Sequence, residues 1–137
     1  MALHLIKLAV GAESVTDMAA WQTQRLKARG ELLHITRMAP KRVDELLKGG
    51  SLYWVVKGVI RVRQKLREVR PITHKGTTHT ALVLDPKLVL VRPTPRRAFQ
   101  GWRYLEGKDV PRDLPKGAAD KAMPEEMRDA LVELGLL

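Results

Sequence analysis

The chain has 137 residues with 25 Lys and Arg, 15 Asp and Glu and no cysteine, so its formal charge is +10. The missing cysteines exclude disulfide scaffolds, Cys-ligated metal sites and thiol catalysis, and no apolar run approaches the ~18 residues of a membrane span. The N-terminus lacks the pattern of a secretory signal, so we expect one basic, cytoplasmic domain over residues 1–137.

The N-terminal part predicts a strand and then a helix. Residues 2–10 form a short apolar run that is typical of a buried strand. Ser14 and Asp17 have the spacing of a capping box, and Gly30 ends the helical pattern that follows. We expect Trp21, which lies among apolar helix positions, to pack in the core.

Further strands and two short helices follow. Gly58 interrupts one strand and indicates a bulge or a close approach of the backbone. The predicted strands span residues 32–38, 51–70, 78–84 and 88–92, and helices are predicted after Pro40 and from Pro124 to Gly135.

The order of the elements predicts an α+β fold. Two helices come near the N-terminus, one closes the chain, and the central strands are joined by short turns. This pattern favours a small mixed or antiparallel sheet and leaves open whether the sheet curls into a barrel.

The positive charge is concentrated in the middle of the chain. Residues 34–112 hold 18 basic and 6 acidic residues, whereas the two flanks hold 7 basic and 9 acidic ones. A concentrated basic region favours a polyanionic partner through phosphate neutralisation. The alternative is a solvated cationic face that binds nothing acidic.

Alternation within residues 59–67 predicts a row of cations. Ile60, Val62 and Leu66 fall on one face of the strand. The other face carries cations about 7 Å apart, close to the spacing of phosphates along a single strand. These cations are Arg61, Arg63, Lys65 and Arg67.

Two further segments combine aromatic and cationic residues. In the first, Tyr53 and Trp54 point to opposite faces, so we expect one ring to pack inward and the other to lie exposed beside Lys57; the alternative places both rings in the core. The second is residues 95–104, where arginines could grip phosphate, aromatics could stack on bases and Gln100 could bond a base edge. Its arginines and aromatics are Arg96, Arg97, Arg103, Phe99, Trp102 and Tyr104. A loop pinned by its own aromatics is the alternative.

No motif identifies an enzyme. Neither phosphate-loop pattern occurs, and Tyr53 stands where a nucleophile elbow after Gly49 would need glycine. The histidines have no metal-ligand spacing. We therefore expect no metal and no cofactor, and we assign no catalytic residue.

Three blocks of the sequence resemble a known family. They are ALHLIKLAVG, HITRMAPKRVDELLKGGSLYWVVKGVIRVRQ and PTPRRAFQGWRYL, which look like the bacterial domain-of-unknown-function family 1489. That resemblance implies a small cytoplasmic bacterial protein and no defined activity. A weaker resemblance of arrangement, to the PUA-like and ASCH group, implies a pseudobarrel that binds RNA or a modified base.

Three functional hypotheses follow. The first is a nucleic-acid-binding module, with RNA favoured over DNA, that uses the cation row, Tyr53 or Trp54, and residues 95–104. The second is a small hydrolase on a modified nucleoside or nucleotide-like substrate, with Lys57 as the activated amine or charge stabiliser and Glu68 or Asp44 as the proton carrier. The third is a protein–protein adaptor with exposed leucines near the C-terminus, namely Leu131, Leu134, Leu136 and Leu137. The sequence does not determine the oligomeric state.

Overall fold

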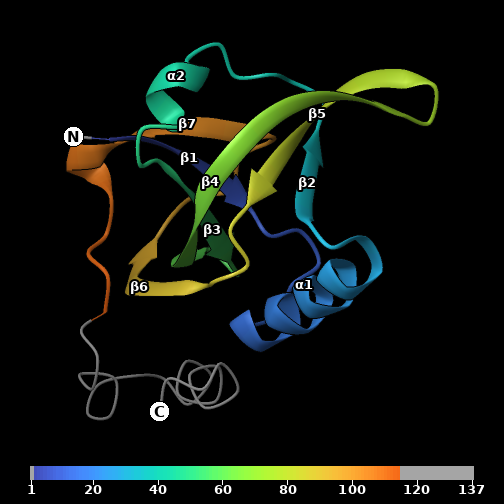
Figure 1. Cartoon of the computed structure of the whole chain (residues 1–137). Coiled ribbons are helices and arrows are strands. Elements are labelled where there is room, and N and C mark those ends of the chain that lie inside the picture. The colour runs from blue at the N-terminus through green and yellow to red at the C-terminus, as the bar shows by residue number, and fades with distance from the viewer. Residues whose placement is uncertain (1, 115–137) are drawn as a thin grey trace.

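The computed structural model of the chain describes residues 2–114, of which 48% are in strands and 19% in helices. Figure 1 shows a long twisted strand that crosses the molecule, with the other elements arranged around it. The elements are β1 (Leu3–Leu8), α1 (Val15–Arg29), β2 (Leu32–Thr36), α2 (Val43–Leu46), β3 (Ser51–Val56), β4 (Val59–His74), β5 (Thr77–Leu84), β6 (Val89–Pro95), β7 (Trp102–Glu106) and the 3-10 turn η1 (Gly107–Asp109).

The ends of α1 are set by the residues that predicted them. The Ser14 hydroxyl accepts a hydrogen bond from the backbone N–H of Asp17 at 3.1 Å, which satisfies one of the unpaired donors of the first turn. Gly30 ends the helix in the left-handed conformation, at a φ of 76°, and its N–H bonds the Leu26 carbonyl. The predicted helix and its capping residues are therefore confirmed.

Two Lys-Gly pairs form the tight turns on either side of β4. Lys57 and Gly58 join β3 to β4, and Lys75 and Gly76 join β4 to β5; all four residues have positive φ, as a type I′ hairpin turn requires. Gly58 belongs to the turn, so the predicted bulge is wrong, but the alternative of a close backbone approach is confirmed, since the Gly58 carbonyl accepts a 2.8 Å hydrogen bond from the Arg96 N–H. The register shifts further along the pair, where Trp54 faces Val62, Val55 faces Ile60 and Arg61 is the extra residue on β4.

The strands form one mixed sheet in the order β2-β5-β4-β3-β1-β7, with β6 paired to β4 off this path. The β1–β3 pair is parallel and the remaining pairs are antiparallel. Val62 of β4 pairs with Trp54 of β3 and also with Leu90 of β6, so β3 and β6 lie on opposite sides of β4. The 16-residue strand β4 therefore organises the sheet.

The predicted PUA-like pseudobarrel is wrong, because the sheet is open. Its end strands, β2 and β7, do not pair with each other in the described residues. The chain leaves β2 as a loop, and the Trp102 indole N–H on β7 donates a 2.8 Å hydrogen bond to the Met38 carbonyl of this loop. Within the described residues, β7 is thus linked to the loop after β2 by a side-chain hydrogen bond, while no strand pairing joins β7 to β2 and closes a barrel. The predicted C-terminal helix lies outside the described residues.

The core has two parts, one on each side of the sheet. The larger part packs α1 and α2 against the sheet and includes Leu5, Val15, Met18, Leu46, Leu52, Trp54, Val62, Leu66 and Leu82. The smaller part lies on the opposite face and consists of Ile6, Tyr53, Val55, Ile60, Val91 and Leu105, with Phe99 packed against it.

Candidate functional site

Burial alternates along β4 as predicted, but Ile60 does not share a face with Val62 and Leu66, since Ile60 belongs to the smaller core and the other two to the larger core. Of the four predicted cations, Arg63 and Arg67 are paired with carboxylates. Ile60, Val62, Gln64 and Leu66 are buried, and the intervening side chains are more exposed. The Nε and Nη2 atoms of Arg63 donate to the two carboxylate oxygens of Asp113, each at 2.7 Å, as two parallel bonds that suit a guanidinium. The hydrogen bond from Arg63 lowers the pKa of Asp113.

The other members of the row differ from one another. Arg67 forms an ion pair with Asp85 at 3.1 Å, and Lys65 is exposed. Arg61 is partly buried, and its Nε and Nη1 atoms have no hydrogen-bond partner within residues 2–114. The structure thus brings the four cations onto one strand without forming a uniform row of unpaired charges.

The three aromatic side chains proposed to stack on bases are buried. Tyr53 is 3%, Trp54 5% and Trp102 9% exposed. The expectation that Tyr53 or Trp54 would lie exposed is wrong and the alternative with both rings in the core is confirmed, because β3 is an inner strand with a packed core on each face. None of these rings can stack on a base in this conformation.

Lys57 lies at the surface of the molecule. It occupies the β3–β4 turn and forms a 2.6 Å ion pair with Glu13. Glu68 is eleven residues along β4 from the turn and pairs with Arg70, while Asp44 belongs to α2. The structure does not bring together the residues of the proposed hydrolase.

The segment between β6 and β7 holds the predicted arginines at the surface. Arg96, Arg97 and Gln100 are exposed. The Arg96 N–H bonds the Gly58 carbonyl at 2.8 Å and anchors the segment to the β3–β4 turn. The Arg103 guanidinium lies 5.7 Å from the centre of the Phe99 ring, a cation–π arrangement that leaves its charge accessible.

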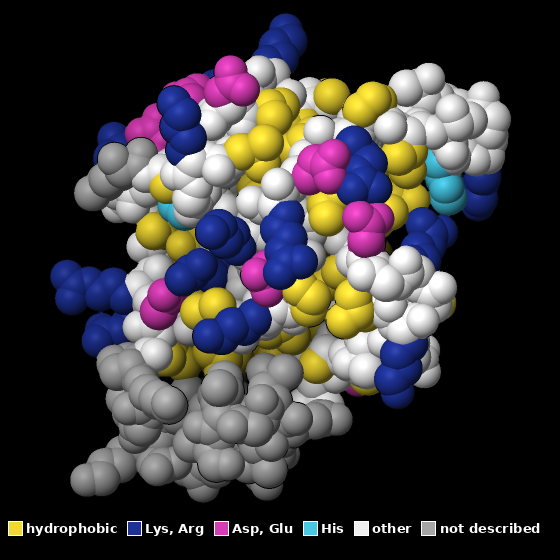
Figure 2. Space-filling view, in the orientation of Figure 1, with side chains coloured by type: hydrophobic (Ala, Val, Ile, Leu, Met, Phe, Trp, Pro, Cys, Tyr) yellow, Lys and Arg dark blue, Asp and Glu magenta, His cyan; other side chains and the backbone are white. Residues whose placement is uncertain are grey.

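These arginines differ from those of β4 in their partners. Within residues 2–114, Arg96, Arg97 and Arg103 have no acidic side chain at ion-pair distance, and the neighbouring Arg92 has none either. Figure 2 shows Lys and Arg side chains gathered over the middle of one face, with a few acidic ones between them. We call Arg92, Arg96, Arg97 and Arg103 the loop arginines.

A second feature, which the motif search missed, is a cavity between α1 and β2. Its inner chamber has a volume of about 120 Å³ and is lined by side chains that include Met18, Trp21, Gln22, Arg25, His34 and Trp54. It meets an outer groove of about 310 Å³ at Arg25, Leu33 and His34. Trp21, expected in the core, is 39% exposed at this site. We call the two parts together the α1–β2 cavity.

A buried polar network forms one wall of the inner chamber. Gln64 is fully buried, and its side-chain oxygen accepts hydrogen bonds from the Trp54 indole at 2.8 Å and from Gln22 at 2.9 Å. Its amide nitrogen donates to Gln22 and to the Asp85 carbonyl. One signal in the sequence could have indicated this network. Gln64 stands among the apolar positions of β4, and a buried side-chain amide needs hydrogen-bond partners.

His34 is held neutral next to this wall. Its ring meets the Trp54 ring edge-on, with 5.1 Å between centroids, and its buried Nε2 has no hydrogen-bond partner in the described part of the chain. Burial lowers the pKa of His34 to about 4, and the charges of Lys7 and Arg25 act in the same direction. The pKa of Lys7 is itself lowered by burial.

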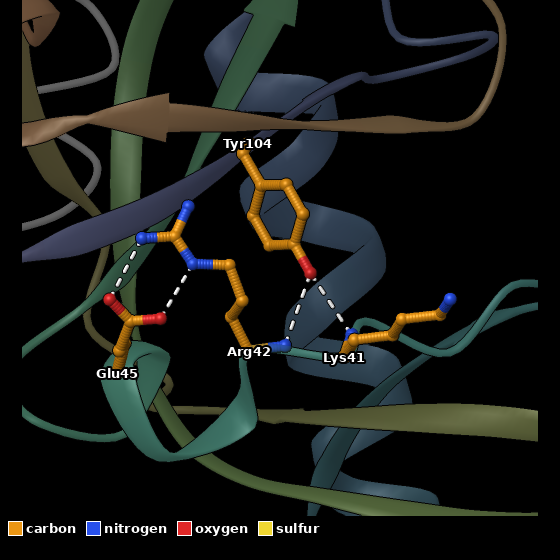
Figure 3. Close-up of polar contacts among 4 residues, drawn as sticks. All are labelled: Lys41, Arg42, Glu45 and Tyr104. Carbon is orange, nitrogen blue, oxygen red and sulfur yellow. Dashed lines mark hydrogen bonds and ion pairs between the residues drawn. The ribbon is translucent and has the colours of Figure 1, made fainter.

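A third cluster joins β7 to the start of α2 (Figure 3). The Tyr104 hydroxyl accepts hydrogen bonds from the backbone N–H groups of Lys41 and Arg42 at 3.0 and 3.2 Å. Arg42 also forms a two-bond ion pair with Glu45. The Tyr104 hydroxyl and the Glu45 carboxylate are both taken up by these bonds, so we interpret the cluster as a structural link between β7 and the loop after β2.

The described residues give no sign of a metal centre or a membrane segment. Residues 2–114 contain no group of three or more His, Asp or Glu side chains placed to hold a metal ion. Neither of the two described α-helices is both long and apolar enough to cross a bilayer.

Comparison with known proteins places the chain in a family but gives no activity. No curated protein and no solved structure shows significant similarity to it, so the resemblance to PUA-like proteins has no support. A family model described as "Protein of unknown function (DUF1489)" matches residues 5–137. This match covers nearly the whole sequence and confirms the family resemblance, so the chain belongs to the DUF1489 family.

Proposed function

We propose that this protein binds nucleic acid, with single-stranded RNA favoured over DNA, mainly through phosphate contacts from the loop arginines. The observation that carries the proposal is that these exposed arginines have no acidic partner in residues 2–114, whereas Arg63 and Arg67 on β4 do. An arginine without a carboxylate partner keeps its donors for a phosphate.

The shape of the segment favours a single strand as the ligand. Arg96 and Arg97 lie on the short connection between β6 and β7, Arg92 lies on β6 and Arg103 on β7, and neither described helix carries any of them. A flexible single strand can follow such a loop, whereas duplex DNA is usually read by a helix or a β-ribbon in its major groove. Because the predicted stacking rings are buried, the proposal rests on charge, with Gln100 as a candidate for a base contact.

The test is fluorescence anisotropy with a labelled single-stranded RNA, the matching single-stranded DNA and a DNA duplex, between about 50 and 200 mM salt. The triple variant R96A/R97A/R103A removes three cations. For three phosphate contacts to a single strand, the slope of log K against log salt falls by about 2.

The matched control is K27A/K48A/K87A, which removes three exposed cations on other elements. The control is expected to keep most of the affinity for RNA. Equal losses in the two variants would show that only the net charge of the protein matters, and undetectable binding of the wild type to every probe would refute the proposal.

A further inference from the structure

The α1–β2 cavity has an apolar interior of limited size. Besides the tryptophans, its inner chamber is lined by Met18, Leu32 and Leu84. Its volume of about 120 Å³ is close to that of engineered apolar cavities of ~150 Å³ that bind benzene. The chamber therefore has room for one small ring.

The inner chamber is lined by two polar side chains that the protein itself occupies or encloses, Gln22 and His34. The side-chain amide of Gln22 is already bonded to Gln64 through both its oxygen and its nitrogen. The Nε2 atom of His34 is buried and has no partner in residues 2–114. Because this nitrogen is buried, it does not face the open chamber, so the polar contact for a ligand has to come from the entrance.

The outer groove adds positive charge at the entrance. Arg25 and Arg29 line it, and neither has an acidic side chain at ion-pair distance within the described residues. Glu31 also lines the groove, but both its oxygens are bonded to Arg70, at 3.1 and 3.0 Å. The groove thus keeps two unneutralised arginines beside an apolar chamber.

We propose that the α1–β2 cavity binds a small planar single-ring anion, with the ring in the inner chamber against Trp54 and the carboxylate or phosphate on Arg25. Trp21 and the exposed Val10 form the outer rim and cover the ring. This site is separate from the loop arginines, so the two proposals stand or fall independently.

The test measures binding of benzoate and of uridine 5′-monophosphate by calorimetry and by saturation-transfer NMR. Each anion is paired with a neutral analogue of the same ring, benzamide or uridine, which separates the charge from the shape. The two arms also distinguish a carboxylate from a phosphate ligand. We expect at least one anion to bind about tenfold more tightly than its neutral analogue, since one charge-assisted bond is involved.

Variants locate the binding. Arg25→Gln changes an exposed helix side chain and is expected to remove the preference for the anion. Lys27→Gln, a matched change on the same helix outside the cavity lining, is expected to leave it intact. Ala9→Leu, which enlarges a lining side chain, is expected to weaken binding of the ring itself.

Four results would overturn the proposal. They are no saturable binding of any probe up to about 10 mM, equal affinity for anion and neutral analogue, unchanged binding in Arg25→Gln, and an equal loss in Lys27→Gln. The variant R96A/R97A/R103A is expected to bind these small anions like the wild type. RNA binding that is lost in R96A/R97A/R103A while small anions still bind therefore concerns the nucleic-acid proposal. Small-anion binding that is lost in Arg25→Gln while RNA still binds concerns the cavity.

Discussion

Replacing Gln64 by leucine removes the centre of a buried hydrogen-bond network while keeping a side chain of similar size. In the wild type Gln64 is fully buried and bonds Trp54, Gln22 and the Asp85 carbonyl. In Gln64→Leu the Trp54 indole N–H loses its partner inside the core. A buried donor without a partner costs about 1–3 kcal/mol.

The total loss is expected to be about 2–4 kcal/mol of unfolding free energy. The Asp85 carbonyl also loses a bond, whereas Gln22 is only partly buried and can turn to water. Urea unfolding followed by circular dichroism measures the change as a shift in midpoint at constant slope. Gln100→Leu, the same replacement at an exposed position, is the control and is expected to stay within ~0.5 kcal/mol of the wild type.

A double-mutant cycle with Trp54→Phe isolates the bond between the two side chains. Phenylalanine has no N–H to leave unpaired, so the double variant is expected to be more stable than the sum of the single changes predicts. The coupling energy should be about 1–2 kcal/mol. Strictly additive effects, or a Gln64→Leu variant as stable as Gln100→Leu, would show that the network does not hold α1 against the sheet.

Three further changes test other parts of the fold by the same unfolding measurement. Gly50→Ala would place a Cβ 2.3 Å from two backbone oxygens and is expected to cost about 3 kcal/mol or more of unfolding free energy. In the control Gly49→Ala the new Cβ meets nothing within 4 Å but the residue has a φ of +90°, so the cost should be only about 1–2 kcal/mol. A larger loss in Gly49→Ala than in Gly50→Ala would contradict the packing at Gly50. Tyr104→Phe removes the acceptor of two exposed N–H groups that water can replace, so a loss of about 0.5–1.5 kcal/mol is expected; a loss above ~3 kcal/mol would mean that this link does more than join β7 to a loop. Because the folded pKa of His34 is lowered from 6.5 to about 4, the unfolded chain takes up the proton first as the pH falls, and about 3 kcal/mol of stability is lost between pH ~6.5 and ~4. The variant His34→Phe should flatten that part of the pH profile, and an unchanged profile would show that the ring is not held neutral.

Much of the local structure could be predicted from neighbouring residues. Ser14 and Gly30 mark the ends of α1, and the alternation from Val62 to Leu66 predicts the face of β4 that lies against the larger core. These signals are local, since caps and strand periodicity depend on residues a few positions apart. The strand β7 was missed because the arginines and aromatics of residues 96–105 indicated a loop.

The candidate sites depended on contacts between distant parts of the chain. Asp113 neutralises Arg63 from fifty positions away, and Gln22 meets Gln64 across forty-two. A periodic pattern in the sequence does not indicate contacts between such distant residues, so the sequence could not show which cations stay unpaired. For the same reason the isolated His34 gave no sign of the cavity that it lines.

The sequence by itself determined the concentration of positive charge, the family, and the elements whose ends and faces are set by nearby residues. Only the tertiary structure decided that the sheet stays open and that Tyr53, Trp54 and Trp102 are buried. It also decided that, among residues 2–114, the exposed cations without acidic partners include Arg96 and Arg97 between β6 and β7. The physical reason is that burial and ion pairing depend on what packs against a side chain, and in this fold the packing partners come from distant strands and helices.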